Sequence, residues 1–291
     1  MLTTFGANQW DTLFSSDLQS QAVENIENGH ILCFPELPFT LLENEKRFLT
    51  PECADPKAKN VGYSSLQNRL WGVQRLSDTE HQALKAMLER YARYSYTLVA
   101  HLLPSYVNHM KVGRTSYRPI QVSNRKSSYR KDDKRLHVDA FPSSPNQGQR
   151  ILRVFCNINP NNEDRVWRIG EPFEQVANRF LPKIPKPFPG VAALLRFLKI
   201  TKSYRTPYDH YMLQMHDRMK ADEWYQKNAD QQEVRFPSGT TWIVQTDHVS
   251  HAAMQGQFLL EQTFYLPVNA MQDPSRAPLR VLERLLNRPL L

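Results

Sequence analysis

Cysteine, glycine and long apolar runs are all scarce in this sequence of 291 residues. The three cysteines, Cys33, Cys53 and Cys156, form no close pair, which excludes a disulfide scaffold and a cysteine-rich zinc motif. No stretch approaches the roughly 18 uninterrupted apolar residues of a transmembrane helix, because two basic residues break the longest candidate, 191–200. The chain starts without a basic region followed by an apolar run, so we expect no secretory signal and a cytoplasmic location.

Acidic residues are outnumbered as well. The chain has 37 Lys and Arg against 29 Asp and Glu, a net charge of +8 at pH 7. This excess predicts affinity for an anionic partner, but it does not choose among a nucleic acid, a lipid head group and an acidic small molecule. The apolar fraction of 41% and the length together exclude disorder throughout.

The organisation of the chain predicts the α+β class. Residues 1–111 form a helix-rich part that is expected to pack on an antiparallel β core over 112–268. A helical insertion interrupts this core at about 170–230, and a basic amphipathic tail follows over 269–291. No composition typical of a linker separates these parts, so we expect 1–291 to form a single integrated domain.

Individual elements can also be predicted. Ser77 and Glu80 form a capping box, after which apolar residues recur at helical spacing up to Pro104. This is the clearest helix in the sequence. Runs rich in β-forming residues predict strands over 30–35, 150–159, 240–247 and 258–268.

One short motif has the residue types of a metal site. His137 and Asp139 are two positions apart, and in a strand such residues point to the same face. They would supply two of the three ligands in the two-histidine, one-carboxylate triad of non-haem iron(II) oxygenases. Alone the motif is weak evidence, because a strand-edge histidine hydrogen-bonded to an aspartate gives the same pattern.

The third ligand would come from the C-terminal part of the β region, where His248 and His251 follow a predicted strand. Their spacing does not choose between them. The small side chains of Ala252 and Ala253 leave room beside His251, so we favour His251 and keep His248 as the alternative.

Two arginines are candidates for binding an acidic co-substrate. Oxygenases of this kind commonly use 2-oxoglutarate, whose second carboxylate needs a buried cation such as a guanidinium. Arg153 lies in an apolar strand where an unpaired charge would be costly to bury, although it could also be a surface residue of an edge strand. Arg118 is the second candidate, within a segment, 111–135, that has nine basic residues and two aspartates. Such a segment is usually a solvated loop, but beside an iron site it would select an anionic substrate.

Longer stretches resemble a known family. HVDAFPSSPNQGQRILRVFCNINP at 137–160, GEPFEQVANRFLP at 170–182 and FPSGTTWIVQTDHVSHAAMQGQFLLEQTFYLP at 236–267 are similar to the bacterial hydroxylases of 3-deoxy-D-manno-oct-2-ulosonic acid (Kdo), and ILCFPELPF at 31–39 also fits. These hydroxylases are iron(II)/2-oxoglutarate-dependent dioxygenases that act on lipopolysaccharide.

The resemblance implies a double-stranded β-helix (jelly roll) flanked by helices. It implies that His137, Asp139 and His251 bind the iron and that Arg118 and Arg153 hold 2-oxoglutarate. Many members of the wider superfamily carry an arginine about ten residues after the distal histidine, and this sequence has none there. A cation from another strand must then replace it, which strengthens the case for Arg153.

The activity implied is hydroxylation of C3 of Kdo in Kdo-lipid A to give Ko, with iron(II), 2-oxoglutarate and O2. Because lipid A lies in a membrane, we expect the enzyme to contact the cytoplasmic face of the inner membrane through 191–200 or through the tail, where arginines recur every four residues from Arg276 to Arg288. The alternative for the tail is an ordinary helix packed on the core. No nucleic-acid partner is expected, and the sequence does not give the oligomeric state.

Three other functions stay open from the residues alone. The same iron site could act on another anionic substrate, such as a nucleic acid or a protein. Zinc also accepts two histidines and a carboxylate, which would suit a hydrolase. A non-catalytic basic binding module is disfavoured, because it would not need the histidine and aspartate pairing.

Overall fold

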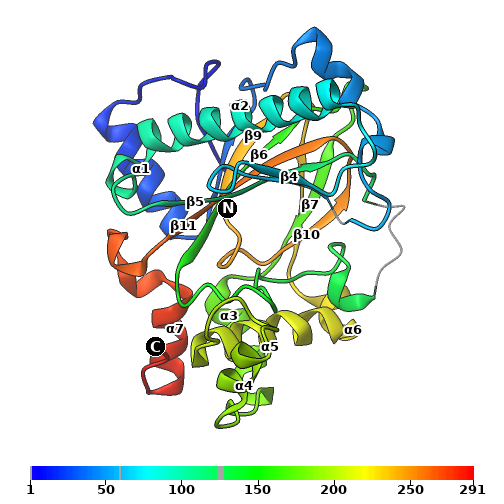
Figure 1. The fold of residues 1–291 in the computed structure, drawn as a ribbon. Helices are drawn as coiled ribbons and strands as arrows, with labels where there is room; N and C mark the ends of the chain where they lie inside the picture. The colour runs from blue at the N-terminus through cyan, green and yellow to red at the C-terminus, as the bar shows by residue number, and fades with distance from the viewer. Residues whose placement is uncertain (1, 59, 123–127) are drawn as a thin grey trace.

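Two β-sheets packed face to face form the centre of the protein, in a computed structural model that describes residues 2–58, 60–122 and 128–291 (Figure 1). The strands are β1 (Leu2–Thr4), β2 (Ile31–Phe34), β3 (Val61–Ser64), β4 (Arg69–Trp71), β5 (Lys111–Arg118), β6 (Arg150–Asn157), β7 (Arg165–Ile169), β8 (Gln232–Phe236), β9 (Thr241–Gln245), β10 (His251–Gln255) and β11 (Leu259–Leu266). The helices are α1 (Ser16–Glu27), α2 (Asp78–Leu102), α3 (Phe173–Phe180), α4 (Val191–Phe197), α5 (Pro207–Ala221), α6 (Glu223–Asn228) and α7 (Pro278–Leu286).

The larger sheet has the strand order β1-β2-β9-β6-β11-β5-β3-β4, and the smaller one has the order β10-β7-β8. Apart from the parallel pair β1 and β2, the strands pair antiparallel. The chain passes from β9 in the large sheet to β10 in the small one and back to β11. The predicted α+β jelly roll is confirmed. The large sheet also reaches beyond the core expected over 112–268, because the N-terminal part adds β1 to β4 to it.

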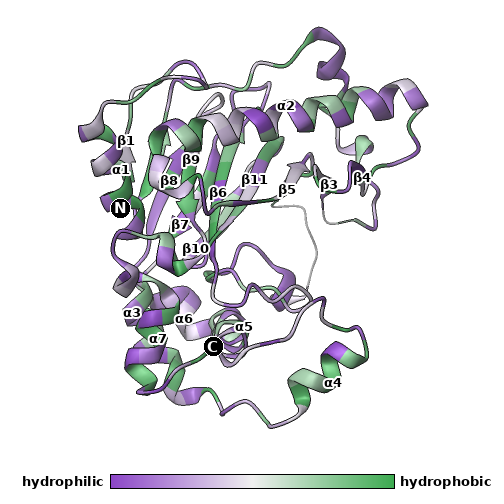
Figure 2. Ribbon diagram, turned by 60° about the vertical axis from the view of Figure 1, so that its left-hand side comes forward, coloured by the Kyte–Doolittle hydropathy of each residue, from purple (hydrophilic) through white to green (hydrophobic). Residues whose placement is uncertain are grey.

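Helix α2 covers the outer face of the large sheet, as Figures 1 and 2 both show. It begins with the predicted capping box, in which the Ser77 backbone N–H donates to the Glu80 carboxylate at 2.9 Å. The hydroxyl of Tyr91 donates to the carbonyl oxygen of Val154 at 3.0 Å and so fixes the helix to β6.

Alternation along β6 separates two cores, because successive side chains of a strand point to opposite faces. Leu152, Val154 and Cys156 belong to the larger core, which α2 covers. Phe155 points the other way, into a smaller core between the two sheets, where its ring stacks on Trp242 with centroids 5.3 Å apart. Arg153 shares the inner face of β6 with Phe155. It is the one charged residue on that face, so its guanidinium group lies between the two sheets.

Helices α3 to α7 gather at the other end of the molecule (Figure 1). The apolar residues of α7, among them Leu279, Val281 and Leu282, are buried against the protein. The carboxylate of Glu27 accepts the backbone N–H groups of Gln272 and Asp273, each at 2.8 Å, and ties the start of the tail to α1. The tail therefore has the arrangement of a packed helix, with its apolar face covered. Within the described residues, no helix has the length and apolar character needed to cross a membrane.

Candidate metal centre

His137, Asp139 and His251 come together in the structure. Each offers a ligand atom, and the three atoms all lie within 4.8 Å of one another. Nε2 of His137 is 3.8 Å from Oδ1 of Asp139, and the two imidazole centroids are 4.6 Å apart. Within the described part of the chain, this is the one group of three metal-ligating side chains placed to share an ion.

The backbone brings these residues together through a single bridge. The N–H of His137 donates to the carbonyl of His251 at 3.0 Å, and the N–H of His251 donates back at 2.9 Å. The Asp139 N–H instead donates to the carbonyl of Thr246 at 2.8 Å. His137 and Asp139 therefore do not lie in a regular strand, the geometry from which their shared face was argued. The segment is extended but changes its hydrogen-bond partner after one pair, so no ladder forms.

Both histidines are oriented by carbonyl groups. Nδ1 of His137 lies 2.7 Å from the carbonyl oxygen of Arg135, and Nδ1 of His251 lies 2.8 Å from that of Val249. A carbonyl oxygen only accepts, so each Nδ1 carries a proton and each Nε2 keeps a lone pair. Burial lowers the pKa of both imidazoles, which favours their neutral form. This is the state that a metal ion requires of a histidine ligand.

His248 lies in a different environment. It stands in the turn between β9 and β10, beside Gly29, with its ring 5.7 Å from that of Phe173. Burial lowers its pKa to about 3.

His248 lines a separate cavity, with Glu171 among the other lining residues, whereas His251 lines the cavity of His137 and Asp139. Of the two alternatives, the structure places His251 in the cluster. His251 is the first residue of β10.

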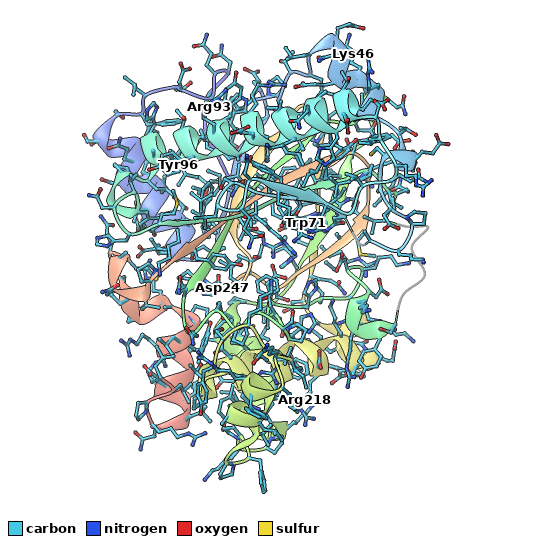
Figure 3. All side chains as sticks on the ribbon, viewed as in Figure 1. Lys46, Trp71, Arg93, Tyr96, Arg218 and Asp247 are labelled. Atoms are coloured by element: carbon cyan, nitrogen blue, oxygen red, sulfur yellow. The ribbon has the colours of Figure 1, made fainter. Side chains whose placement is uncertain are left out.

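The turn before His251 is fixed by a buried ion pair. Oδ2 of Asp247, labelled in Figure 3, accepts from Nε of Arg150 at 2.7 Å, and Oδ1 accepts from the backbone N–H of Ile151 at 3.1 Å. Both charged side chains are fully buried. Because Arg150 and Ile151 begin β6, this contact sets the turn relative to the strand that carries Arg153.

The two predicted arginines line the same cavity as the triad. Arg153 is buried and forms two ion pairs of 2.9 Å, from Nη2 to Asp139 and from Nη1 to Glu261. Arg118 pairs with the other oxygen of Glu261, and its Nη1 is 3.6 Å from Asp133. The structure therefore brings all five predicted site residues together. The role of the two arginines in holding 2-oxoglutarate stays a prediction.

Glu261 is a site residue that the sequence analysis missed. Its burial favours the neutral acid, but Arg118 and Arg153 outweigh that effect and lower its pKa to about 2. The sequence did contain an indication of this residue, because Glu261 and Arg153 carry opposite charges and each lies within an apolar strand. Each would be costly to bury alone. The register of β6 and β11, in which Arg153 faces Thr263, places the two on a diagonal.

Trp167 was missed as well. Its ring stacks on the imidazole of His251, with centroids 5.1 Å apart and planes inclined by 22°. This contact depends on the pairing of β7 with β10, in which Trp167 faces Ala253. Nothing in the sequence predicted which strand would pair with β10, so no signal pointed to Trp167.

The arrangement fits an iron ion and an acidic co-substrate. Two neutral imidazoles and one carboxylate offer ligand atoms within 4.8 Å of one another, a donor set that suits a divalent ion with open positions. The Nε–H groups of Arg118 and Arg153 are buried and, among the described residues, find no hydrogen-bond acceptor. Buried donors of this kind are suited to a carboxylate acceptor. A larger cavity, of about 500 Å³, lies between the N-terminal segment and α2, away from the triad.

Comparisons with known proteins agree with this site. Residues 9–289 match the family model of the 3-deoxy-D-manno-oct-2-ulosonic acid (Kdo) hydroxylases. The chain is also similar to a crystal structure of the Kdo hydroxylase KdoO, a non-haem iron(II), alphaketoglutarate-dependent dioxygenase, in complex with alphaketoglutarate and Fe(III). The identity is 47%, covering 100% of this chain and 97% of that one, with a TM-score of 0.96.

Two further KdoO structures give the same result. A complex with cobalt(II) is 48% identical, covers 99% of this chain and 97% of that one, and has a TM-score of 0.97. A complex with succinate and Fe(III) is 47% identical over the same shares, with a TM-score of 0.96. None of the curated proteins compared with the chain matches it. The chain therefore belongs to the Kdo hydroxylases, a family of iron(II)/2-oxoglutarate-dependent dioxygenases.

Proposed function

We propose that this protein hydroxylates C3 of Kdo in Kdo-lipid A to give Ko, with iron(II), 2-oxoglutarate and O2 as cofactor and co-substrates. The observation that carries the proposal is the cluster of His137, Asp139 and His251 in a chain of this family. In this proposal these three residues hold the iron. Bound iron supplies the O2 chemistry, and the protein supplies orientation and electrostatics.

Arg118 and Arg153 hold 2-oxoglutarate in this proposal. Their buried Nε–H groups have no acceptor among the described residues, and both arginines line the cavity of the triad. Glu261 fixes the two guanidinium groups relative to each other, so that they are oriented before the co-substrate arrives. Such preorganised donors avoid the cost of reorganisation on binding.

The charges around the cavity support an acidic substrate. The lining contains four arginines and two aspartates, and Glu261 adds a third carboxylate, which leaves an excess of one positive charge among these residues. The two charges of iron(II) and those of the 2-oxoglutarate dianion balance each other. One positive charge then remains for the substrate, and Kdo is itself a carboxylate. Arg114, which is exposed and lines the cavity, is the cation best placed to meet it.

We also propose that the enzyme works as a peripheral protein on the cytoplasmic face of the inner membrane. The support is the chemistry of the substrate, since the acyl chains of Kdo-lipid A lie in a bilayer while Kdo lies outside it. The net charge of +8 favours contact with an anionic surface.

The test is turnover of Kdo-lipid A in the presence of iron(II), 2-oxoglutarate and O2. Mass spectrometry should show the gain of one oxygen atom in the Kdo unit, together with release of succinate. Omission of O2 or of 2-oxoglutarate should abolish both. Equal succinate release with oligonucleotides or peptides would favour another anionic substrate, and turnover supported by zinc would favour a hydrolase. Activity that persists in His137→Ala would contradict a role for the triad.

A further inference from the structure

The segment around α4 exposes an unusual amount of apolar surface. None of the seven residues of α4 is buried. The large exposed apolar side chains here are Phe188, Val191, Leu194, Phe197, Leu198 and Ile200, and the two phenylalanines are 77% and 82% exposed. In Figure 2 the helix projects from the body of the protein and is coloured as largely hydrophobic. Contiguous apolar surface of this kind usually marks an interaction site.

The charge of the segment is uniform. Between Glu174 and Asp209 the chain has seven lysines and arginines and neither aspartate nor glutamate. Lys186, Arg196 and Lys199 are exposed beside the apolar side chains. A second copy of the chain would bring like charges together at this surface. An anionic bilayer, by contrast, accepts the apolar side chains between its head groups and offers phosphates to the basic ones.

The segment is also connected to the metal centre. After α4 the backbone N–H of Lys202 donates to the carbonyl of Ser143 at 2.9 Å, and Nη2 of Arg205 donates to that of Pro142 at 2.6 Å. The loop that accepts these bonds begins directly after Phe141, which lines the triad cavity together with Asp139. A surface that binds α4 is therefore linked, through one short loop, to the residues at the cavity.

We propose that residues 188–200 form a membrane-docking element. Phe188, Leu194 and Phe197 enter the boundary between head groups and acyl chains of an anionic bilayer, and the neighbouring lysines and arginines bind lipid phosphates. The inference rests on the proposed function in one respect, that a membrane-embedded substrate requires the enzyme to reach the bilayer. Vesicle binding, however, can be measured without substrate.

The test uses the full chain and vesicles of phosphatidylethanolamine and phosphatidylglycerol, with phosphatidylcholine vesicles for comparison. The double variant Leu194→Glu/Phe197→Glu should lower the fraction that floats with anionic vesicles by about tenfold or more, because it replaces apolar contact with like charge. The matched control is Leu13→Glu/Leu66→Glu, which changes two side chains that are 80% and 87% exposed on other surfaces. This control should bind as the unaltered protein does.

A second variant reports the depth of contact. Phe197→Trp should show a blue-shifted emission with anionic vesicles, and brominated acyl chains should quench it. Unchanged flotation of Leu194→Glu/Phe197→Glu, or a tryptophan at position 197 that stays exposed to water, would overturn the proposal. So would a concentration-dependent dimer of the unaltered protein, seen in sedimentation velocity, that this double variant abolishes.

Activity separates this inference from the proposed function. Leu194→Glu/Phe197→Glu should hydroxylate a soluble Kdo glycoside without acyl chains at the unaltered rate, and should lose activity only on Kdo-lipid A in vesicles. Equal loss on both substrates would contradict a docking role. If the unaltered protein binds vesicles through α4 but hydroxylates neither substrate, the proposed function fails and the docking element stands.

Discussion

His137 and His251 exchange two backbone hydrogen bonds, of 3.0 and 2.9 Å, although they are 114 positions apart in the chain. Each imidazole is then held by a carbonyl two residues earlier in its own segment, that of Arg135 or that of Val249. The site is therefore built on backbone geometry, and both Nε2 atoms are oriented before any ion binds. Preorganisation of this kind raises metal affinity, because little ordering remains to be done on binding.

Glu261→Gln should destabilise the protein by about 3 kcal/mol, because it leaves the buried Arg153 and the largely buried Arg118 with one negative charge fewer. Urea unfolding followed by circular dichroism measures the change. Glu233→Gln is the control, since its ion pair with Arg235 is exposed and should be worth less than about 1 kcal/mol. Equal destabilisation by both variants would show that the buried carboxylate has no special role.

Arg153→Lys should weaken the binding of 2-oxoglutarate about tenfold or more, because an ammonium group cannot reproduce the geometry of the guanidinium and loses a charge-assisted hydrogen bond. Anaerobic calorimetric titration with 2-oxoglutarate, with the metal site saturated, measures the affinity. Arg235→Lys, on the exposed surface of β8, should bind 2-oxoglutarate as before. An unchanged affinity in Arg153→Lys would remove this residue from the co-substrate site.

Trp167→Phe should abolish most of the fluorescence quenching that accompanies cobalt(II) binding. The indole of Trp167 stacks on His251, a proposed ligand, and quenching by a bound ion falls steeply with distance. Trp10→Phe is the matched control, since Trp10 lies between α2 and Phe39, away from the cluster. The same residual quenching in both variants would place the bound ion elsewhere.

The sequence predicted the parts of the fold that depend on local pattern. The capping box at Ser77 and the strand over 150–159 follow from backbone hydrogen bonding and from a run of β-forming residues, and both are found as expected, the strand as β6. The pairing order of the strands depends on contacts distant in the chain, which no local pattern records. For this reason the addition of β1 to β4 to the large sheet was not foreseen.

The site residues divide in the same way, into those that a local pattern indicates and those that depend on strand pairing. His137 and Asp139 were predicted because their spacing suits two ligands of one metal ion, and Arg153 because a charge in an apolar strand is costly to bury unpaired. His251 could not be separated from His248 by spacing, since the distinction depends on where β10 begins. Trp167 could not be found at all, because its contact with His251 exists only once β7 pairs with β10.

The most direct test of the account is the visible spectrum of the protein with iron(II) and 2-oxoglutarate under anaerobic conditions. The unaltered protein should show the weak charge-transfer band of iron(II) chelated by the keto acid. His251→Ala should lose this band, and His248→Ala should keep it, because His248 lines a different cavity from the triad. A band that survives in His251→Ala and disappears in His248→Ala would contradict the proposed metal centre.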